Sequence, residues 1–410
     1  MKKIINHSSG KIFSMEKVFQ IYTLGCKVNQ YNSEFIRENL LEKGWKEGEG
    51  GCVIINGCVV TGTAERKTRK RIYQAIRKGE KVIVTGCFAR YRDDFSSAIL
   101  LPEGEKVVRF LTGESPSRRQ ISQFPEHQRV WVKVQEGCPA NCAYCIVPRV
   151  RGRIYSRPLE EVVEEVRQLE ERYAEIVLTG THLGIYGKEW GITLAELVER
   201  LLKNIRRARI RLSSVEIKEV DDKLLDLFSS PHLCPHLHLP LQSGSTRILR
   251  LMNRPYTKEE YLGRVEKIRK RVKDIALSTD IMIGFPFETE KDFQESVEMI
   301  RRVGFMRVHI FPYSLRPGSL AERFPPLPPR TVKEREKRME EVVKDVTRKV
   351  KDAQIGRLKK VLIEGKEGGG YSEDYFWVKV KDRVSLGEIV PVRVICRKED
   401  ELFGEVDYGE

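Results

Sequence analysis

Short apolar runs alternate with amphipathic helical patterns over residues 17–324 of the chain. Runs such as 52–57 (CVIING) and 81–86 (KVIVTG) have the length and the β-branched content of buried strands. The stretches between the runs, such as 33–44, have helical spacing and end at a glycine. Alternation of this kind predicts parallel sheets covered by helices, which is an α/β fold.

The chain divides into three segments with different patterns. Residues 17–125 contain three strand patterns and predict a small parallel α/β sheet domain, followed by a polar linker with two prolines. Residues 129–324 contain six strand patterns, which predict a partial (β/α)6 barrel; an open doubly wound sheet is the alternative. Beyond a proline-rich boundary and a charged helical stretch, residues 355–410 predict a small antiparallel β-barrel.

Composition indicates a globular protein of the cytoplasm without a membrane segment. Apolar residues make up 40% of the chain and charged residues 32%. No apolar run reaches the ~18 residues that a membrane helix needs. The first residues contain two lysines but no apolar core of the kind found in a secretory signal, and Met15 is an alternative start to Met1.

The chain carries a strong positive charge that favours a polyanionic partner. Lys plus Arg number 74 and Asp plus Glu number 59, which gives a net charge of +15. The basic residues cluster in stretches 66–71, 149–157 and 203–211. Residues 357–410 are different, with 10 basic against 12 acidic side chains. A nucleic-acid surface in the first two segments explains this distribution, and a solvated basic surface is the alternative.

Three cysteines of the first segment stand at equivalent positions. Cys26, Cys58 and Cys87 each follow one of its three strand patterns. Because parallel strands end at the same edge of a sheet, we expect these three thiols to converge there. The chain has nine cysteines, and an odd number in a reducing compartment argues against a disulfide framework. We assign Cys52, Cys234 and Cys396 to ordinary packing.

A second cysteine group follows the first strand pattern of the second segment. The sequence CPANCAYC places Cys138, Cys142 and Cys145 at C-x3-C-x2-C spacing. Three thiolates can hold three corners of a 4Fe–4S cube and leave the fourth iron open. A zinc site requires a fourth ligand, and His127 lies at no familiar spacing from this group. We therefore predict a cluster, with zinc or inert thiols as alternatives.

The C-x3-C-x2-C group, with Tyr144 before its last cysteine, resembles the signature of radical S-adenosylmethionine (SAM) enzymes. The resemblance extends over nearly the whole chain to the methylthiotransferase family, whose members end in a TRAM-like barrel. It rests on pieces such as LGCKVNQYNSE, GCPANCAYCIVPRVRGRIYSRP, HLHLPLQSGSTRILRLMNRPYT and STDIMIGFPFETE. The sequence departs from the family pattern at Gly57, where threonine is usual, and in GYSEDY of the barrel.

The resemblance implies two 4Fe–4S clusters. The cluster on Cys138, Cys142 and Cys145 would bind SAM at its open iron and yield a 5′-deoxyadenosyl radical. The cluster on Cys26, Cys58 and Cys87 would carry sulfur, so that a methylthio group replaces a hydrogen of the substrate. One SAM would serve as radical source and another as methyl donor.

Within this family, the sequence is most similar to the branch that modifies carbon 2 of threonylcarbamoyl-adenosine next to the anticodon of tRNA. The alternatives within the family are isopentenyl-adenosine of tRNA and an aspartate of a ribosomal protein. An alternative of another class is a non-catalytic iron–sulfur protein that binds RNA. The resemblance implies a monomer whose partners are a tRNA anticodon stem-loop, a flavodoxin- or ferredoxin-like electron donor and a sulfur source.

Positions at the strand ends of the second segment are candidate SAM contacts. By their place in the barrel we expect them to contact the amino group, the ribose or the adenine of SAM; they are Thr179, Gly180, Ser213, Glu216, Gln242, Ile283 and Gly284. We expect the histidines on or near the strand ends to have structural roles; they are His182, His236, His238 and His309.

Overall fold

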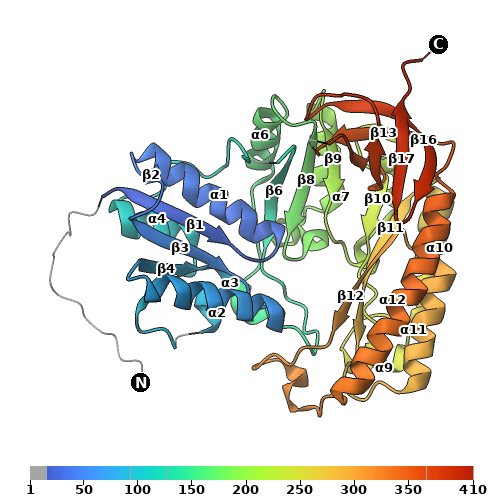
Figure 1. The fold of residues 1–410 in the computed structure, drawn as a ribbon, viewed down its shortest axis with the longest axis horizontal. Helices are drawn as coiled ribbons and strands as arrows, with labels where there is room; N and C mark the ends of the chain where they lie inside the picture. The colour runs from blue at the N-terminus through green and yellow to red at the C-terminus, as the bar shows by residue number, and fades with distance from the viewer. Residues whose placement is uncertain (1–15, 93, 126, 366, 410) are drawn as a thin grey trace.

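A computed structural model describes residues 16–92, 94–125, 127–365 and 367–409 (Figure 1). Both candidate start residues, Met1 and Met15, lie outside the described residues. The N-terminal sheet lies on one side of the core, and the C-terminal barrel lies on another. In the described part of the chain, no helix is long and apolar enough to cross a membrane.

The N-terminal segment is a five-stranded parallel sheet with helices on both faces. Its strands are β1 (Val18–Thr23), β2 (Lys46–Glu47), β3 (Cys52–Gly57), β4 (Lys81–Thr85) and β5 (Ala98–Leu100), in the order β2-β1-β3-β4-β5. The helices are α1 (Lys27–Glu42), α2 (Gly62–Arg77), α3 (Gly86–Tyr91) and α4 (Gly104–Thr112). Ile36 and Val107 of α1 and α4 pack against one face, and Ile72 and Phe88 of α2 and α3 pack against the other. The predicted parallel sheet is confirmed.

The core has six parallel strands in two adjoining sheets. They are β6 (Arg129–Glu136), β8 (Glu175–Gly180), β9 (Arg209–Leu212), β10 (His236–His238), β11 (Ala276–Ile283) and β12 (Arg307–Pro312). Single bridges, such as Ser214 to His238, join β9 to β10. A short strand, β7 (Tyr155–Ser156), pairs with the end of β6 in the antiparallel sense. The predicted partial barrel is confirmed, and the open doubly wound alternative is wrong.

Helices cover the outside of the core. They are α6 (Leu159–Leu169), α7 (Leu194–Asn204), α8 (Asp222–Asp226), α9 (Thr246–Leu251), α10 (Lys258–Arg271) and α11 (Glu290–Val303), whereas α5 (Val147–Arg151) packs against the N-terminal segment through Val150. Three of them begin with a threonine cap and an acidic residue three positions later that satisfy each other's backbone donors; the caps are Thr193, Thr257 and Thr289. Local sequence therefore fixes where these helices begin.

The C-terminal segment is a long helix followed by a closed five-stranded barrel. Helix α12 is Pro329–Asp352, and the strands are β13 (Leu358–Ile363), β14 (Gly370–Ser372), β15 (Trp377–Val380), β16 (Ile389–Lys398) and β17 (Glu401–Val406). The predicted barrel is confirmed, but it is not fully antiparallel because β15 and β17 run parallel. The short strand β14 and the charged strand β17 have too few apolar residues to give a clear pattern in the sequence.

A buried ionic cluster at the beginning of the core strands attaches the barrel to the core. Glu175 starts β8 and is fully buried. Its carboxylate lies 2.7 Å from Nε of both Arg209 and Arg211 and 3.4 Å from a terminal nitrogen of Arg129. These guanidinium groups outweigh the effect of burial and hold the pKa of Glu175 far below its usual value.

The same arginines donate hydrogen bonds to the barrel backbone. Arg209 donates to the carbonyls of Lys360 and Tyr371 at 2.6 and 2.9 Å. Arg211 donates to the carbonyls of Ser372 and Glu373 at 2.9 and 3.0 Å. Two arginines of the basic stretch 203–211 are therefore buried in an internal interface, and the expectation that they help to form a nucleic-acid surface is wrong.

Replacement of Glu175 by glutamine is expected to destabilise this interface. It removes the carboxylate that three buried guanidinium groups share, and removal of one partner of a buried ion pair typically costs about 3–5 kcal/mol. Urea unfolding followed by tryptophan fluorescence measures the change, and Glu171→Gln at an exposed position is the matched control. An unchanged unfolding midpoint for Glu175→Gln would show that the cluster does not stabilise the docked barrel.

Candidate functional site

The first cysteine triad lies at the carboxyl edge of the N-terminal sheet. Cys26 precedes α1, Cys58 follows β3, and Cys87 is the second residue of α3. Gly25, at a positive φ of 118°, passes so close to Cys58 that an added Cβ would lie 2.7 Å from the Cys58 Cβ. Cys26 and Cys58 are both near enough to Cys87 to act on the pKa of its thiol, so the three thiols lie at the same edge of the sheet.

The second triad lies in the loop between β6 and α5, at the carboxyl end of the first core strand. The backbone N–H of Cys145 donates to the Cys142 carbonyl at 3.0 Å, and Val147 N–H donates to Cys145 Sγ at 3.4 Å. Burial raises the pKa of the Cys145 thiol to about 12, and it likewise raises the pKa of Cys87 to about 12. The loop of the second triad is therefore held by hydrogen bonds of its own backbone.

The side chains of the two triads have the chemistry of iron–sulfur ligands. All nine cysteines are unpaired. In the described part of the chain, no three His, Cys, Asp or Glu side chains are grouped around one point. Thiolates that hold a 4Fe–4S cube stand at its corners and need not converge on one point. Each triad supplies three soft sulfur ligands, so the residues present fit an iron–sulfur cluster at each place.

Arg151, the last residue of α5, connects the first triad to the strand that leads to the second triad. It follows the second triad in sequence, yet its guanidinium lies 3.7 Å from Sγ of Cys26 in the first. It also donates to the side-chain oxygen of Asn29 and lies 3.0 Å from Glu136 at the end of β6. Only 7% of Arg151 is exposed. A buried cation therefore stands beside the first triad and is held by the strand that leads to the second.

A second buried arginine serves the second triad. Arg254 donates to Cys142 Sγ at 3.5 Å and forms an ion pair with Glu216. Tyr256 accepts from Arg254 at 2.8 Å and donates to the Pro240 carbonyl, also at 2.8 Å. This chain of contacts connects a predicted SAM contact, Glu216, to a cysteine of the second triad.

His182 also contacts the second triad, so the expectation of a purely structural role is incomplete. Its Nδ1 lies 3.2 Å from Cys138 Sγ, and its Nε2 lies 2.5 Å from Glu219. Burial lowers the pKa of His182, but these hydrogen bonds outweigh burial and raise it to about 10. By contrast, His236 and His238 each contact the Ser278 hydroxyl at 2.9 Å inside the barrel.

The predicted SAM contacts lie at the strand ends but differ in what surrounds them. Thr179 ends β8 in a buried position, and Ser213 follows β9 half-buried. Gln242 has a positive φ of 68°, a strained conformation for a residue with a side chain. Strain of this kind is common where a backbone is shaped for a ligand.

Three of the predicted contacts also have packing roles. The side chain of Ile283 is fully buried in the main apolar core. A Cβ on Gly284 would lie 2.6 Å from Val332 of α12, and one on Gly180 would lie 3.1 Å from the Gln135 side chain. Only their backbone atoms are therefore available to a ligand.

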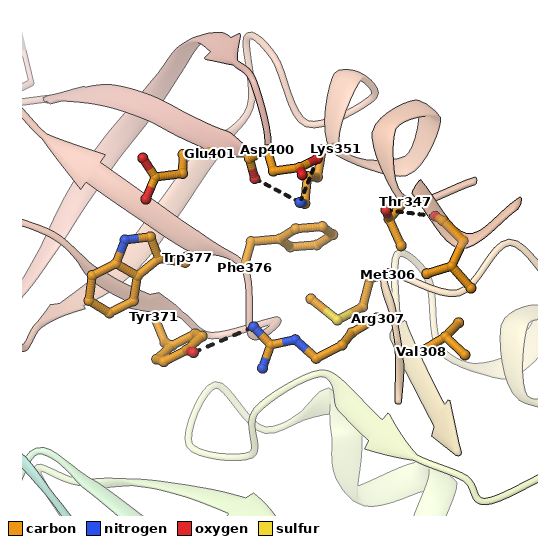
Figure 2. Close-up of a pocket in the computed structure, with 11 residues that line it drawn as sticks. Met306, Arg307, Val308, Thr347, Lys351, Tyr371, Phe376, Trp377, Asp400 and Glu401 are labelled. Atoms are coloured by element: carbon orange, nitrogen blue, oxygen red, sulfur yellow. Dashed lines mark hydrogen bonds and ion pairs between the residues drawn. The ribbon is translucent and has the colours of Figure 1, made fainter. Parts of the chain in front are cut away.

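A cavity of about 600 Å³ lies elsewhere, between the start of β12 and the C-terminal barrel. Figure 2 shows Arg307 and Tyr371 beside it, with a hydrogen bond of 3.4 Å between them. None of the nine cysteines lines this cavity. It opens near the amino ends of the core strands, whereas the two triads lie at carboxyl ends.

The charged residues that surround the thiols are not recognisable from the sequence. Arg151 and Arg254 lie far along the chain from the cysteines that they contact, so no short motif links them. Arg151 even contacts a cysteine of another sheet. Arg151 belongs to the basic stretch 149–157, which suggested a surface, and burial in the structure reverses that interpretation for this residue. Their only signal in the sequence is that each lies within one of the pieces that resemble the family.

Comparison with known proteins identifies the family. Residues 132–300 match the radical SAM superfamily, and residues 18–100 match the uncharacterized protein family UPF0004. The threonylcarbamoyladenosine tRNA methylthiotransferase MtaB of Thermotoga maritima is 37% identical over 94% of this chain and 96% of its own length. The tRNA-2-methylthio-N(6)-dimethylallyladenosine synthase of Aquifex aeolicus is 33% identical over 96% of this chain and 99% of its own length.

Solved structures support the fold. The radical SAM methyltransferase TsrM of Kitasatospora setae, solved with cobalamin and a 4Fe–4S cluster, is similar with a TM-score of 0.53 at 12% identity, over 73% of this chain and 75% of that one. The cobalamin-dependent radical enzyme OxsB, solved with SAM bound, gives 0.51 at 11% identity, over 81% and 56%. The sequence relatives carry the assignment further, and they make the alternative of a non-catalytic RNA-binding protein wrong. This chain belongs to the radical-SAM methylthiotransferase family of enzymes, in the branch of the MtaB proteins.

Proposed function

We propose that this enzyme adds a methylthio group to carbon 2 of threonylcarbamoyl-adenosine beside the anticodon of tRNA. The observation that carries the proposal is the presence of two three-cysteine groups, each one ligand short of four, joined by Arg151. Relatives named for this activity are 33–37% identical over most of the chain. Residues 17–125, 129–324 and 355–410 form three domains that together perform this reaction.

Each triad holds one cluster. Cys138, Cys142 and Cys145 bind the cluster that receives SAM, and Cys26, Cys58 and Cys87 bind the cluster that receives sulfur. When bound, the two clusters and SAM supply a hydrogen-abstracting radical and a methylthio group. The protein holds both centres at one seam and keeps water away from the radical.

The polar residues around the second triad position SAM. Those that approach it from the strand ends are Thr179, Gly180, Ser213, Glu216, Gln242, Ile283 and Gly284. Arg254 fixes the carboxylate of Glu216, so that Glu216 is oriented toward the ribose. Gly180, Ile283 and Gly284 contribute backbone atoms because their side-chain positions are filled or enclosed.

Exposed basic side chains form the surface for tRNA. Arg66, Lys67 and Lys70 of α2 are exposed, as are Arg149 and Arg153 beside the second triad. Phosphate binding by such groups is independent of sequence and weakens with salt. The enzyme acts as a cytoplasmic monomer with a flavodoxin- or ferredoxin-like electron donor and a separate sulfur source.

A second candidate substrate is dimethylallyl-adenosine of tRNA. It is favoured by relatives with that name that are 33–34% identical over 88–96% of this chain. Mass spectrometry of tRNA nucleosides from a strain that lacks this protein separates the two. We expect the methylthio form of threonylcarbamoyl-adenosine to disappear and to return with the plasmid-borne gene. Loss of the methylthio dimethylallyl form instead would select the second candidate.

Anaerobic reconstitution tests the two cluster assignments. Two 4Fe–4S clusters correspond to about eight iron atoms per chain, and Cys138→Ala or Cys26→Ala should each leave about four. With dithionite and SAM, the wild-type protein and Cys26→Ala should form 5′-deoxyadenosine, whereas Cys138→Ala should not. Cys396→Ala is the matched control. About four irons in the fully reconstituted wild-type protein would contradict the assignment of two clusters.

Arg151 is expected to raise the reduction potential of the first-triad cluster. A cation beside a cluster sulfur stabilises the reduced, more negative form. A charge-assisted contact of ~1.5–3 kcal/mol corresponds to roughly 60–130 mV for a one-electron couple. We therefore expect Arg151→Gln to lower the potential by this amount in an EPR redox titration, performed in the Cys138→Ala background so that one cluster reports. Arg149→Gln, at an exposed position two residues earlier, should leave the potential unchanged.

A further inference from the structure

The core barrel has an open seam between β6 and β12. Strand β12 is the edge of its sheet, and β6 is unpaired on this side except at its last two residues, which pair with β7. The described residues show no backbone ladder between β6 and β12. Helix α1 begins at this seam, because its Gln30 accepts a hydrogen bond from the indole of Trp131 on β6 at 2.5 Å. The first residue of α1 is Lys27, directly after Cys26 of the first triad.

The side chain of Lys27 reaches into the seam from the first triad. Its ammonium lies 5.5 Å from the ring centre of Trp131. Its charge also reaches the opposite side of the seam: burial lowers the pKa of His309 on β12, and Lys27 is among the cations that lower it further. The ammonium therefore lies beside β6, on the side that faces β12.

Lys27 forms no ion pair with a carboxylate among the residues that the structure describes. Two carboxylates of the core strands contact other groups. Asp280 lies 3.2 Å from His238 Nε2. Glu136 lies 3.0 Å from both Lys133 and Arg151. The seam thus holds a cation that is available to an anionic ligand.

The chemistry of the proposed substrate places an anion at this position. In adenine, the acceptor carbon C2 and the carbon that bears N6 both flank N1, so a group on N6 lies close to C2. The acceptor carbon would have to approach the sulfur that the first triad would carry, and Lys27 directly follows Cys26 of that triad. An N6 substituent would then lie on the side of Lys27. A threonylcarbamoyl substituent carries a carboxylate, whereas a dimethylallyl substituent is uncharged.

We propose that Lys27 binds the carboxylate of the threonylcarbamoyl group and selects this substrate over uncharged N6-substituted adenosines. This inference rests on the proposed function and identifies a specificity-determining residue within it. The Trp131 ring lies beside the ammonium and offers an apolar wall to the remainder of the substituent. An ion pair in a partly enclosed seam favours a charged substituent over an uncharged one more strongly than an ion pair on an open surface does.

The test compares three anticodon stem-loop RNAs that differ only at the target nucleoside. One carries threonylcarbamoyl-adenosine, the second its neutral carboxamide, and the third dimethylallyl-adenosine. The reconstituted proteins are wild type, Lys27→Gln, Lys27→Arg and the control Lys291→Gln, whose lysine is exposed on α11. The readouts are kcat and KM for methylthio product by mass spectrometry, iron content, and 5′-deoxyadenosine formed without RNA.

We expect wild type and Lys291→Gln to prefer the carboxylate over the carboxamide by about 10- to 100-fold in kcat/KM. Lys27→Gln should lose this preference, mainly through KM, and Lys27→Arg should retain most of it. Iron content and 5′-deoxyadenosine without RNA should be the same in all four proteins, because Lys27 is not a cluster ligand in this scheme.

Different outcomes overturn different claims. Equal activity of the wild-type protein on the carboxylate and the carboxamide overturns the role of Lys27 even if Lys27→Gln fails to fold or to load iron. A full preference retained by Lys27→Gln overturns it as well. A wild-type protein that acts on dimethylallyl-adenosine and not on threonylcarbamoyl-adenosine overturns the proposed function itself.

Discussion

The buried guanidinium of Arg151 connects the two halves of the site. It extends from the helix that follows the second triad, contacts Cys26 of the first, and is held by Glu136 at the end of β6. Burial of a cation is costly unless it is paired and hydrogen-bonded. Lys133 and Arg151 outweigh burial and lower the pKa of Glu136 to about 2, so the carboxylate stays charged and the pair stays intact at neutral pH. This contact helps to fix the relative position of the two sheets, together with hydrogen bonds from α1 such as those of Gln30 to Trp131 and of Tyr31 to Glu165.

Much of the positive charge of the chain is buried, where it forms ion pairs and hydrogen bonds within the protein. Arg129, Arg209 and Arg211 surround Glu175 beneath the barrel, and Arg254 stands behind the second triad. The C-terminal barrel closes the lower end of the core through backbone carbonyls that accept from two of these arginines. A net charge of +15 therefore overstates the surface available to RNA, and the exposed residues of α2 and stretch 149–157 remain for that role.

The strand ends were predictable, and so was the gathering of thiols there. The observed β3 coincides with the predicted run 52–57, because it is a fully enclosed strand of largely apolar sequence. Cys26, Cys58 and Cys87 converge because parallel strands end at one edge. The strands β14 and β17 were missed, since their sequences are short or charged and pair only in the context of the closed barrel.

The sequence by itself determined the α/β architecture, the two triads and the family, because these depend on local periodicity and on short motifs. Only the tertiary structure decided which charged residues serve the thiols. Arg151 contacts a cysteine 125 residues away, and Lys27 meets a ring on β6 more than a hundred residues later. Contacts between sheets leave no periodic signal along the chain, and whether an arginine is buried or exposed depends on the fold as a whole.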